Sequence, residues 1–244
     1  GQVAPRLSIV YDSGAAGGVA GLGGHVAGLS VIHRCPATAA QDGRFDGVSR
    51  DGADRFCIDD RRLVRVAGDG GAEYRTEVET FQKIVAVGSV PYPDGGSGPR
   101  SFVVHPGDGS RLEYGAEPSS RDLDARGVVV AWRVSRLEDV DGNTMAYRYA
   151  GHVGTGPDGE RTVERLPVEI AYGGNPGQGV SLSLAVRFHF EERPDRRYGY
   201  AGGVAFAVTR RLRSVETRVG AQTVRRYHVV YVEDGLAGRS RIAS

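Results

Sequence analysis

Hydrophobic and polar residues alternate with a period of two over much of this chain. The clearest case is VSLSLAVRFHF, residues 180–190. Its apolar residues at alternate positions are Val180, Leu182, Leu184, Val186, Phe188 and Phe190. Successive side chains of a β-strand point to opposite faces, so the pattern predicts a half-buried antiparallel strand with its apolar face toward the core.

Three shorter stretches repeat this alternation. Their apolar residues are Val128, Val130, Trp132 and Val134; Met145, Tyr147 and Tyr149; and Tyr227, Val229 and Tyr231. No stretch carries the i, i+3, i+4, i+7 apolar spacing of an amphipathic helix over three turns. We therefore expect an all-β fold with very little helix, either an extended, curved antiparallel sheet or a β-sandwich-like arrangement.

Turn signals separate the predicted strands. They are Asp108-Gly109, Asp141-Gly142, Asp158-Gly159 and Gly173-Gly174-Asn175. Such pairs supply the positive φ angles that two-residue hairpins need. Similar strands are expected on both sides of the two loop-like segments, 91–99 and 151–159. We therefore expect one domain over residues 1–244.

Composition and charge fit a globular protein without a nucleic-acid partner. The chain is 40% hydrophobic and 25% charged, and its 37 glycines favour many short strands joined by tight turns. Its formal net charge is only +1, whereas nucleic-acid binders usually carry a net basic surface. No apolar run approaches the ~18–20 residues that span a bilayer, and no basic-then-apolar signal peptide opens the chain.

The only two cysteines, Cys35 and Cys57, are 22 positions apart. They could form a disulfide in a secreted protein or remain two buried thiols in a reduced one, and the sequence leaves both alternatives open.

The glycine-rich segment from Tyr11 to Cys35 shares features with two functional signatures but lacks a necessary part of each. Ser13, in Asp-Ser-Gly, would need a histidine base, and His25 and His33 follow it too closely. A phosphate-binding loop would lead into a helix, whereas LSVIHR reads as a strand. We interpret the segment as strand, bend and strand.

Metal and catalytic signatures are equally incomplete. His33, Cys35 and Cys57 lack a fourth zinc ligand at finger spacing, and DVDGN at 139–143 lacks the later glycine and glutamate of a calcium loop. Calcium binding by the acidic run Asp42, Asp46, Asp51 and Asp54 is a lesser alternative. Glu77 and Glu79 resemble the paired carboxylates of a mono-ADP-ribosyltransferase without its other parts. We expect no catalytic residue, metal or cofactor.

Several motifs occur together in one order. They are the opening PRLSIVYDSGAAGGVAGLGGHVAGLSVIHRCPATAAQDG, then DRFCIDDRRLV, EYRTEVETFQKIVA, RVSRLEDVDGNTMAYRY, ERPD and the closing GRSRIAS. The combination resembles the SpvB-type domain, the N-terminal module of the Salmonella virulence plasmid B protein and of insecticidal toxin-complex B components. One departure is Gly24, where such domains usually have tryptophan, so a packing aromatic is missing there.

The resemblance implies a non-catalytic structural module at the N-terminal part of a much longer toxin, secreted by a bacterium and cytoplasmic before export. It implies a downstream β-propeller and Rhs (Tyr-Asp) repeats in the same chain, which form a β shell around a toxic C-terminal region, and other toxin-complex subunits as partners. Glu77 and Glu79 would not inherit the ADP-ribosyltransferase role, which belongs to a different domain.

The alternative function is recognition of a glycan or a protein. Tyr92, Tyr198 and Tyr200 lie in glycine- and arginine-rich stretches that we expect to be loops, where binding residues often gather. A third hypothesis, an unrecognised enzyme, would use Ser13, Glu77 or Glu79.

Overall fold

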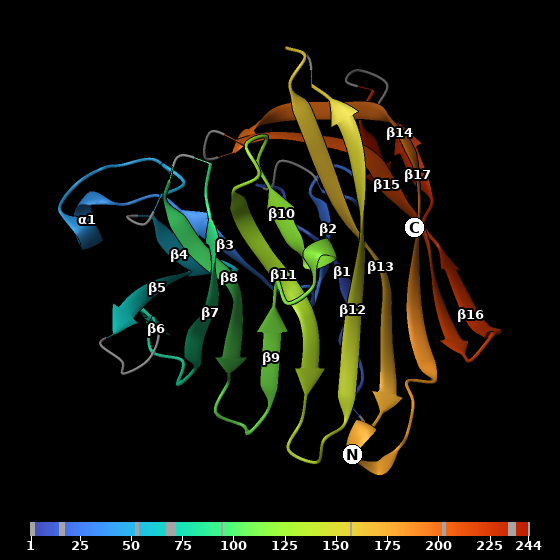
Figure 1. Cartoon of the computed structure of the whole chain (residues 1–244). Coiled ribbons are helices and arrows are strands. Elements are labelled where there is room, and N and C mark those ends of the chain that lie inside the picture. The colour runs from blue at the N-terminus through green and yellow to red at the C-terminus, as the bar shows by residue number, and fades with distance from the viewer. Residues whose placement is uncertain are drawn as a thin grey trace. The chain divides into compact units, whose positions relative to one another are not determined.

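The computed structural model describes residues 3–14, 18–51, 54–66, 72–93, 95–156, 158–201, 204–233 and 238–243. Within these ranges the chain is almost entirely β-structure (Figure 1). The helices described are α1 (Ala39–Asp42) and two 3-10 turns, η1 (Pro118–Ser120) and η2 (Pro176–Gln178). The expectation of an all-β chain with very little helix is confirmed.

The chain divides into two compact units. Unit 1 comprises Gly1–Leu29, Asn143–Gly199 and Phe206–Ser244, and unit 2 comprises Ser30–Gly142 and Tyr200–Ala205. The expectation of a single domain over residues 1–244 stays a prediction.

Unit 2 contains a closed antiparallel barrel of eight strands. These are β3 (Val31–Cys35), β4 (Arg55–Ile58), β5 (Arg61–Val66), β6 (Glu73–Thr76), β7 (Lys83–Pro91), β8 (Ser97–His105), β9 (Arg111–Tyr114) and β11 (Val129–Glu138). Each strand pairs with the next in that order, and β11 pairs with both β9 and β3, which closes the ring. A short strand, β10 (Arg121–Leu123), pairs with β11.

Aromatic rings fill the interior of the barrel. Phe102 and Trp132, both fully buried, meet edge to face with ring centroids 5.0 Å apart. Phe56 packs against both of these rings and against Tyr74. An eight-stranded barrel has an interior just wide enough for side chains to fill. Closure hides the sheet edges that the predicted sandwich-like or extended sheet would leave open, which is where this part of the fold differs from the expectation.

Unit 1 holds an open antiparallel sheet with long strands. In sheet order these are β16 (Gln222–His228), β15 (Val204–Val219), β14 (Leu184–Ala201), β13 (Arg161–Gly174) and β12 (Thr144–Thr155). Two further pairs form small sheets of their own: β1 (Ser8–Tyr11) with β2 (Gly24–Ala27), and β17 (Tyr231–Glu233) with β18 (Ser240–Ile242).

The alternating stretch at 180–190 is a strand over only part of its predicted length. Val186 and Phe188 are buried as expected, but Val180 and Leu182 are exposed. Gly179, in the left-handed region with φ of 69°, ends the turn η2, and the strand β14 begins only at Leu184. The predicted Asp-Gly turns are confirmed. Gly109, Gly142 and Gly159 each have a positive φ angle and lie between consecutive strands.

Removing a ring from the barrel core should destabilise the chain strongly. We expect Phe102→Ala to lower the free energy of unfolding by about 3–5 kcal/mol, because the barrel wall cannot collapse into the space left behind. The matched control is Val153→Ala on β12, since Val153 is exposed and its loss should cost less than about 0.5 kcal/mol. Urea unfolding measures both, and equal losses would contradict the packing described above.

Candidate functional site

In unit 1 a buried arginine joins three distant parts of the chain. Arg193, in the ERPD motif on β14, has a side chain only 1% exposed. Its Nε and Nη2 both donate to the Asp195 carboxylate at 3.0 Å, and its Nη1 donates to the carbonyl of Gly18 at 3.1 Å. Arg193 and Asp195 lie two positions apart on one strand, so their side chains share a face. We call Gly18, Arg193, Asp195, Arg211 and Ser240 the Arg193 junction.

The closing GRSRIAS segment attaches to the same pair. Asp195 accepts hydrogen bonds from the backbone N–H of Ser240 at 2.9 Å and from its hydroxyl at 2.7 Å. The Ser240 carbonyl in turn accepts the N–H of Leu22 at 2.8 Å. The glycine-rich segment, β14 and β18 are thus held together by one charged group and its partners.

Arg211 on β15 extends the junction. Its Nη1 donates to the Ser240 hydroxyl at 2.8 Å and its Nε to Glu191 at 2.7 Å. Its guanidinium lies over the Tyr231 ring, 4.5 Å from the centroid, a distance at which a cation is attracted to the ring face. The Tyr231 hydroxyl donates to the Leu212 carbonyl at 2.6 Å, and burial raises the pKa of Tyr231 to about 12.

The junction keeps Asp195 ionised. Burial by itself would raise the pKa of this carboxyl above its ordinary value of 3.8, but the hydrogen bonds from Arg193 and Ser240 outweigh burial and hold the pKa well below 3.8. A carboxylate fixed in this way by an arginine and a backbone N–H favours a structural role over proton transfer at neutral pH.

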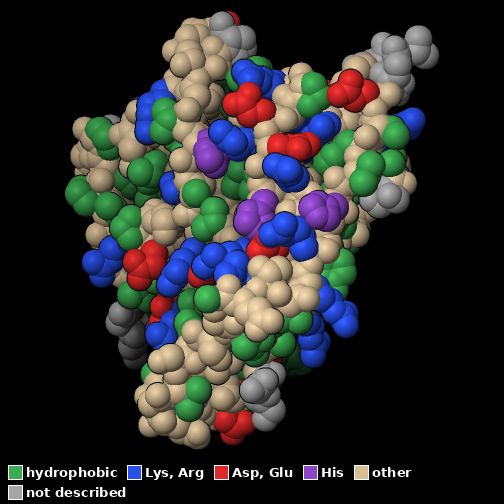
Figure 2. All heavy atoms as spheres, turned by 90° about the vertical axis from the view of Figure 1, so that its right-hand side faces the viewer, with side chains coloured by type: hydrophobic (Ala, Val, Ile, Leu, Met, Phe, Trp, Pro, Cys, Tyr) green, Lys and Arg blue, Asp and Glu red, His purple; other side chains and the backbone are tan. Residues whose placement is uncertain are grey.

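The outer surface of this unit carries charges of both signs. Figure 2 faces the side on which β14 to β17 lie in Figure 1 and shows basic, acidic and histidine side chains gathered across it. Glu169 accepts from Arg148 at 3.0 Å and from Arg187 at 2.6 Å. Glu216 similarly lies between Arg226 and His189. The arginines of these strands are therefore largely matched by carboxylates.

Beside the junction lies an open groove of about 580 Å³ in unit 1. Tyr11, Leu22, Val232 and Ile242 give it an apolar lining, with Arg241 at the same surface. The β1–β2 and β17–β18 pairs supply most of its residues.

Cys35 and Cys57 form a disulfide in this structure. They lie on the paired strands β3 and β4, where His33 is the direct partner of Cys57, so the two cysteines are diagonal neighbours. Their Cα atoms are 5.9 Å apart, within the range that a disulfide can bridge. Of the two alternatives that the sequence left open, the structure has the bridged one.

Tyr92 is not on an exposed surface, so the expectation for this residue is wrong. Its side chain is only 5% exposed, and its hydroxyl accepts a hydrogen bond from Arg34. Arg34 is itself buried, with a side chain 1% exposed and an ion pair to Asp54 at 2.7 Å. The loop-like composition around Tyr92 gives no sign of this burial. Tyr92 is buried because the buried guanidinium of Arg34 needs a polar partner beside it.

Tyr198 and Tyr200 are exposed at 39% and 58%. They lie on the strand β14 and not in a loop. They are two positions apart and therefore share a strand face, and their role in recognition stays a prediction.

Several of the remaining candidate residues have structural partners. Asp42 is paired with Arg55 and Arg62, and Asp54 with Arg34. The His33 ring contacts the Arg34 and Asp59 carbonyls. Glu79 accepts the N–H of Phe81. Over the part of the chain that the structure describes, there is no group of three metal-ligating side chains and no helix long and apolar enough to cross a membrane.

Comparison with known proteins places the fold. No family model and no curated protein matches the chain. Among solved structures, the N-terminal domain of the effector protein SpvB from Salmonella typhimurium strain LT2 superposes with a TM-score of 0.79 at 17% identity, covering 99% of this chain and 93% of that one. The chain has the fold of the SpvB N-terminal domain.

The SpvB-type fold also occurs within larger toxin chains. The TcdB2–TccC3 structure matches with a TM-score of 0.76 at 17% identity, and the Photorhabdus luminescens Tc holotoxin pore with 0.75 at 16%. Each match covers 98% of this chain but only 14% of the toxin chain. The resemblance expected from the sequence motifs is confirmed at the level of the fold.

Sequence reasoning missed Arg34 and Arg193, which are the buried arginines among the described residues. The ERPD motif carried part of the family resemblance, but the sequence analysis assigned no role to Arg193. An arginine and an aspartate two positions apart on a strand can form a bidentate pair, and this was the available signal. Arg34 precedes Cys35 in a strand of mixed polarity, and no local signal distinguishes it from a solvated arginine. Its partners at Asp54, Tyr92 and Val129 are distant in sequence.

Breaking the Arg193–Asp195 pair should destabilise unit 1. We expect Asp195→Asn to lower the free energy of unfolding at pH 7 by about 3 kcal/mol, because the guanidinium stays buried without its counter-charge. The control is Glu192→Gln, which removes an exposed ion pair with Arg196 and should cost less than about 1 kcal/mol.

The same pair predicts a pH dependence. The folded-state pKa of Asp195 lies below the unfolded value, so its contribution is complete above about pH 5 and is lost as the pH falls through the unfolded pKa toward the folded one. The stability gap between the wild type and Asp195→Asn should therefore narrow on acidification. A gap that stays constant from pH 7 to pH 3 would contradict this.

Reducing the disulfide should also lower stability. A bridge across 22 positions restricts the unfolded chain by about 3 kcal/mol. We expect a reducing agent to lower the urea midpoint of the wild type while leaving a Cys35→Ala/Cys57→Ala double variant unchanged. Thiol titration of the unfolded, unreduced protein should find no free thiol, and two free thiols would show the bridge to be absent.

Proposed function

We propose that this chain is a non-catalytic structural module of a secreted bacterial toxin, contributing to a β shell that encloses or delivers a toxic C-terminal region. The observation that carries the proposal is the fold, which is that of the SpvB N-terminal domain and of a 14% portion of the TcdB2–TccC3 and Tc holotoxin chains. The chain as a whole resembles one part of a much larger assembly.

The way the chain uses its charged residues supports this role. A wall module needs segments fixed in place more than it needs reactive groups. The charged side chains of the Arg193 junction hold the glycine-rich segment and β18 against β14 and β15. In the barrel, Arg34 and Asp54 likewise hold chain segments together. The groove beside Ser240 offers an apolar surface for a neighbouring part of the toxin.

The proposal includes partners and location. The partners are a β-propeller and Rhs repeats further along the same chain, together with other toxin-complex subunits. The protein is synthesised in the bacterial cytoplasm and then exported. No nucleic acid, metal or cofactor takes part.

A recognition module for a glycan or a protein is the second candidate. The exposed rings of Tyr198 and Tyr200 favour it, because exposed aromatic side chains provide large, rigid contact area for a partner. This function would not require any further domain.

The reading frame beyond the codon for Ser244 tests the proposal directly. We expect it to continue into propeller and Tyr-Asp repeats. A stop within a few codons would refute the shell function and favour recognition, which a glycan array would then examine. In that case Tyr198→Ala/Tyr200→Ala should abolish binding, whereas Tyr11→Ala, at another exposed tyrosine, should not.

A further inference from the structure

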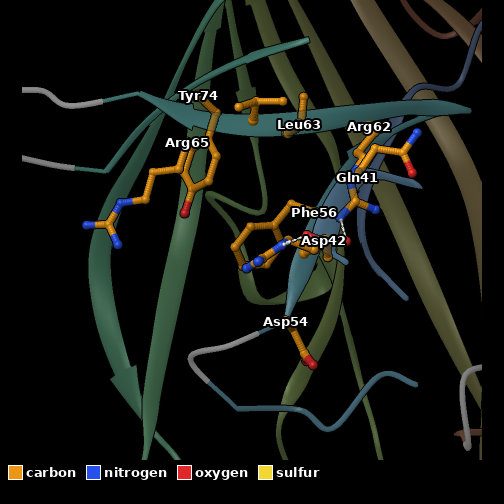
Figure 3. A pocket seen from close by; sticks show the side chains of 10 residues that line it. Gln41, Asp42, Asp54, Phe56, Arg62, Leu63, Arg65 and Tyr74 are labelled. Atoms are coloured by element: carbon orange, nitrogen blue, oxygen red, sulfur yellow. Dashed lines mark hydrogen bonds and ion pairs between the residues drawn. The ribbon is translucent and has the colours of Figure 1, made fainter. Parts of the chain in front are cut away.

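Unit 2 contains a cavity of about 360 Å³ whose lining is not explained by the shell function. It lies among β4, β5, β6 and the α1 turn (Figure 3). Its volume falls in the range of pockets that hold small organic molecules. Phe56 and Leu63, both buried, give it an apolar wall.

Tyr74 points its hydroxyl into this cavity (Figure 3). The side chain is only 8% exposed, and its hydroxyl makes no hydrogen bond to the residues that the structure describes. The hydroxyl is not among the buried unpaired atoms of these residues, so it is open to solvent at the cavity. Burial raises the pKa of Tyr74, against the opposing effect of Arg65 and other arginines, so the hydroxyl remains protonated and able to donate at neutral pH.

Arg65 supplies a positive charge at the same place. It is the register partner of Tyr74 across β5 and β6, so the two side chains leave the sheet on one face. Figure 3 shows its side chain passing the Tyr74 ring, with the guanidinium extending beyond the ring and away from Phe56 and Asp42, and Arg65 is exposed. No carboxylate is paired with Arg65 within the described ranges.

The acidic residues in the lining do not neutralise Arg65. Asp42 divides its carboxylate between Arg55, at 2.7 Å, and Arg62. Those bonds, the largest contribution coming from Arg55, lower the pKa of Asp42 to about 2, so it keeps its charge for these partners. Asp54 is held by Arg34 and by the N–H groups of Ser49 and Arg50.

We infer that this cavity binds a small organic anion, with one carboxylate or phosphate group on an apolar body. Arg65 and the Tyr74 hydroxyl hold the anionic group, and Phe56 and Leu63 contact the apolar part. This site is independent of the shell function, since either could fail while the other holds.

The test uses isothermal titration of the 244-residue chain with four probes. Benzoate and phenyl phosphate carry the anion on an apolar ring, benzamide is the neutral counterpart of benzoate, and inorganic phosphate lacks the ring. We expect saturable binding of benzoate or phenyl phosphate, whichever has the preferred anionic group. Benzamide and inorganic phosphate should bind about tenfold more weakly or not at all.

Two variants assign the binding to these side chains. Tyr74→Phe removes only the hydroxyl and should weaken binding of the preferred probe by about tenfold, and Arg65→Met by tenfold or more. The control Arg161→Met removes an exposed arginine of unit 1 and should leave binding unchanged. Because the Tyr74 hydroxyl has no partner within the described protein, Tyr74→Phe should unfold at the same temperature as the wild type or higher.

Three results would overturn the inference. They are no saturable binding of either aromatic anion by the folded wild type, equal binding of benzamide and benzoate, and unchanged affinity in both Tyr74→Phe and Arg65→Met. A Tyr74→Phe variant that is clearly less stable than the wild type would also count against it, because that outcome would give the hydroxyl a structural role.

Discussion

A buried guanidinium must have its donors satisfied where it lies, and each unit of this chain is organised around one. The side chains of Arg34 and Arg193 are each 1% exposed. Removing such a charge from water costs several kcal/mol unless hydrogen bonds and a counter-charge replace the lost hydration. Arg34 donates to Asp54, Tyr92 and the Val129 carbonyl. Arg193 donates to Asp195 and the Gly18 carbonyl.

This requirement links segments that no local pattern connects. A backbone carbonyl that accepts from a buried arginine cannot move away without leaving a charged donor unpaired, which costs more than the bond itself contributes. In unit 1 the Gly18 carbonyl accepts from Arg193, and the Ser240 hydroxyl donates to Asp195. The buried ion pair therefore holds both residues in place. In unit 2, Tyr92 is buried because it accepts a hydrogen bond from the buried Arg34, although the sequence around Tyr92 is typical of a loop.

Alternation along the sequence predicts which residues form strands but not how the strands close. Val186, Phe188 and Trp132 are buried as their periodicity predicts. The same period of two is compatible with an open sheet, a sandwich or a barrel, since each buries one face. The decisive pairing is β11 with both β9 and β3, and the β3 partner lies about a hundred positions away. The motif-based resemblance supplied the family of folds where periodicity could not, and ERPD and GRSRIAS, two of its motifs, contain residues of the Arg193 junction.

The cavity in unit 2 differs from the rest of the barrel in how its polar groups are satisfied. On β5, Leu63 is buried and forms part of the apolar wall of the cavity, and Arg65, two positions further on the same face, lines the same cavity. Asp42, Asp54 and Arg34 are all bonded within the protein, as a purely structural wall requires. Among the described residues, Arg65 and the Tyr74 hydroxyl are not. The Tyr74 hydroxyl is open to solvent and makes no hydrogen bond to the described residues, so it adds no bond that stabilises this wall. A donor and a cation left open side by side are instead what an anion from outside the chain would need.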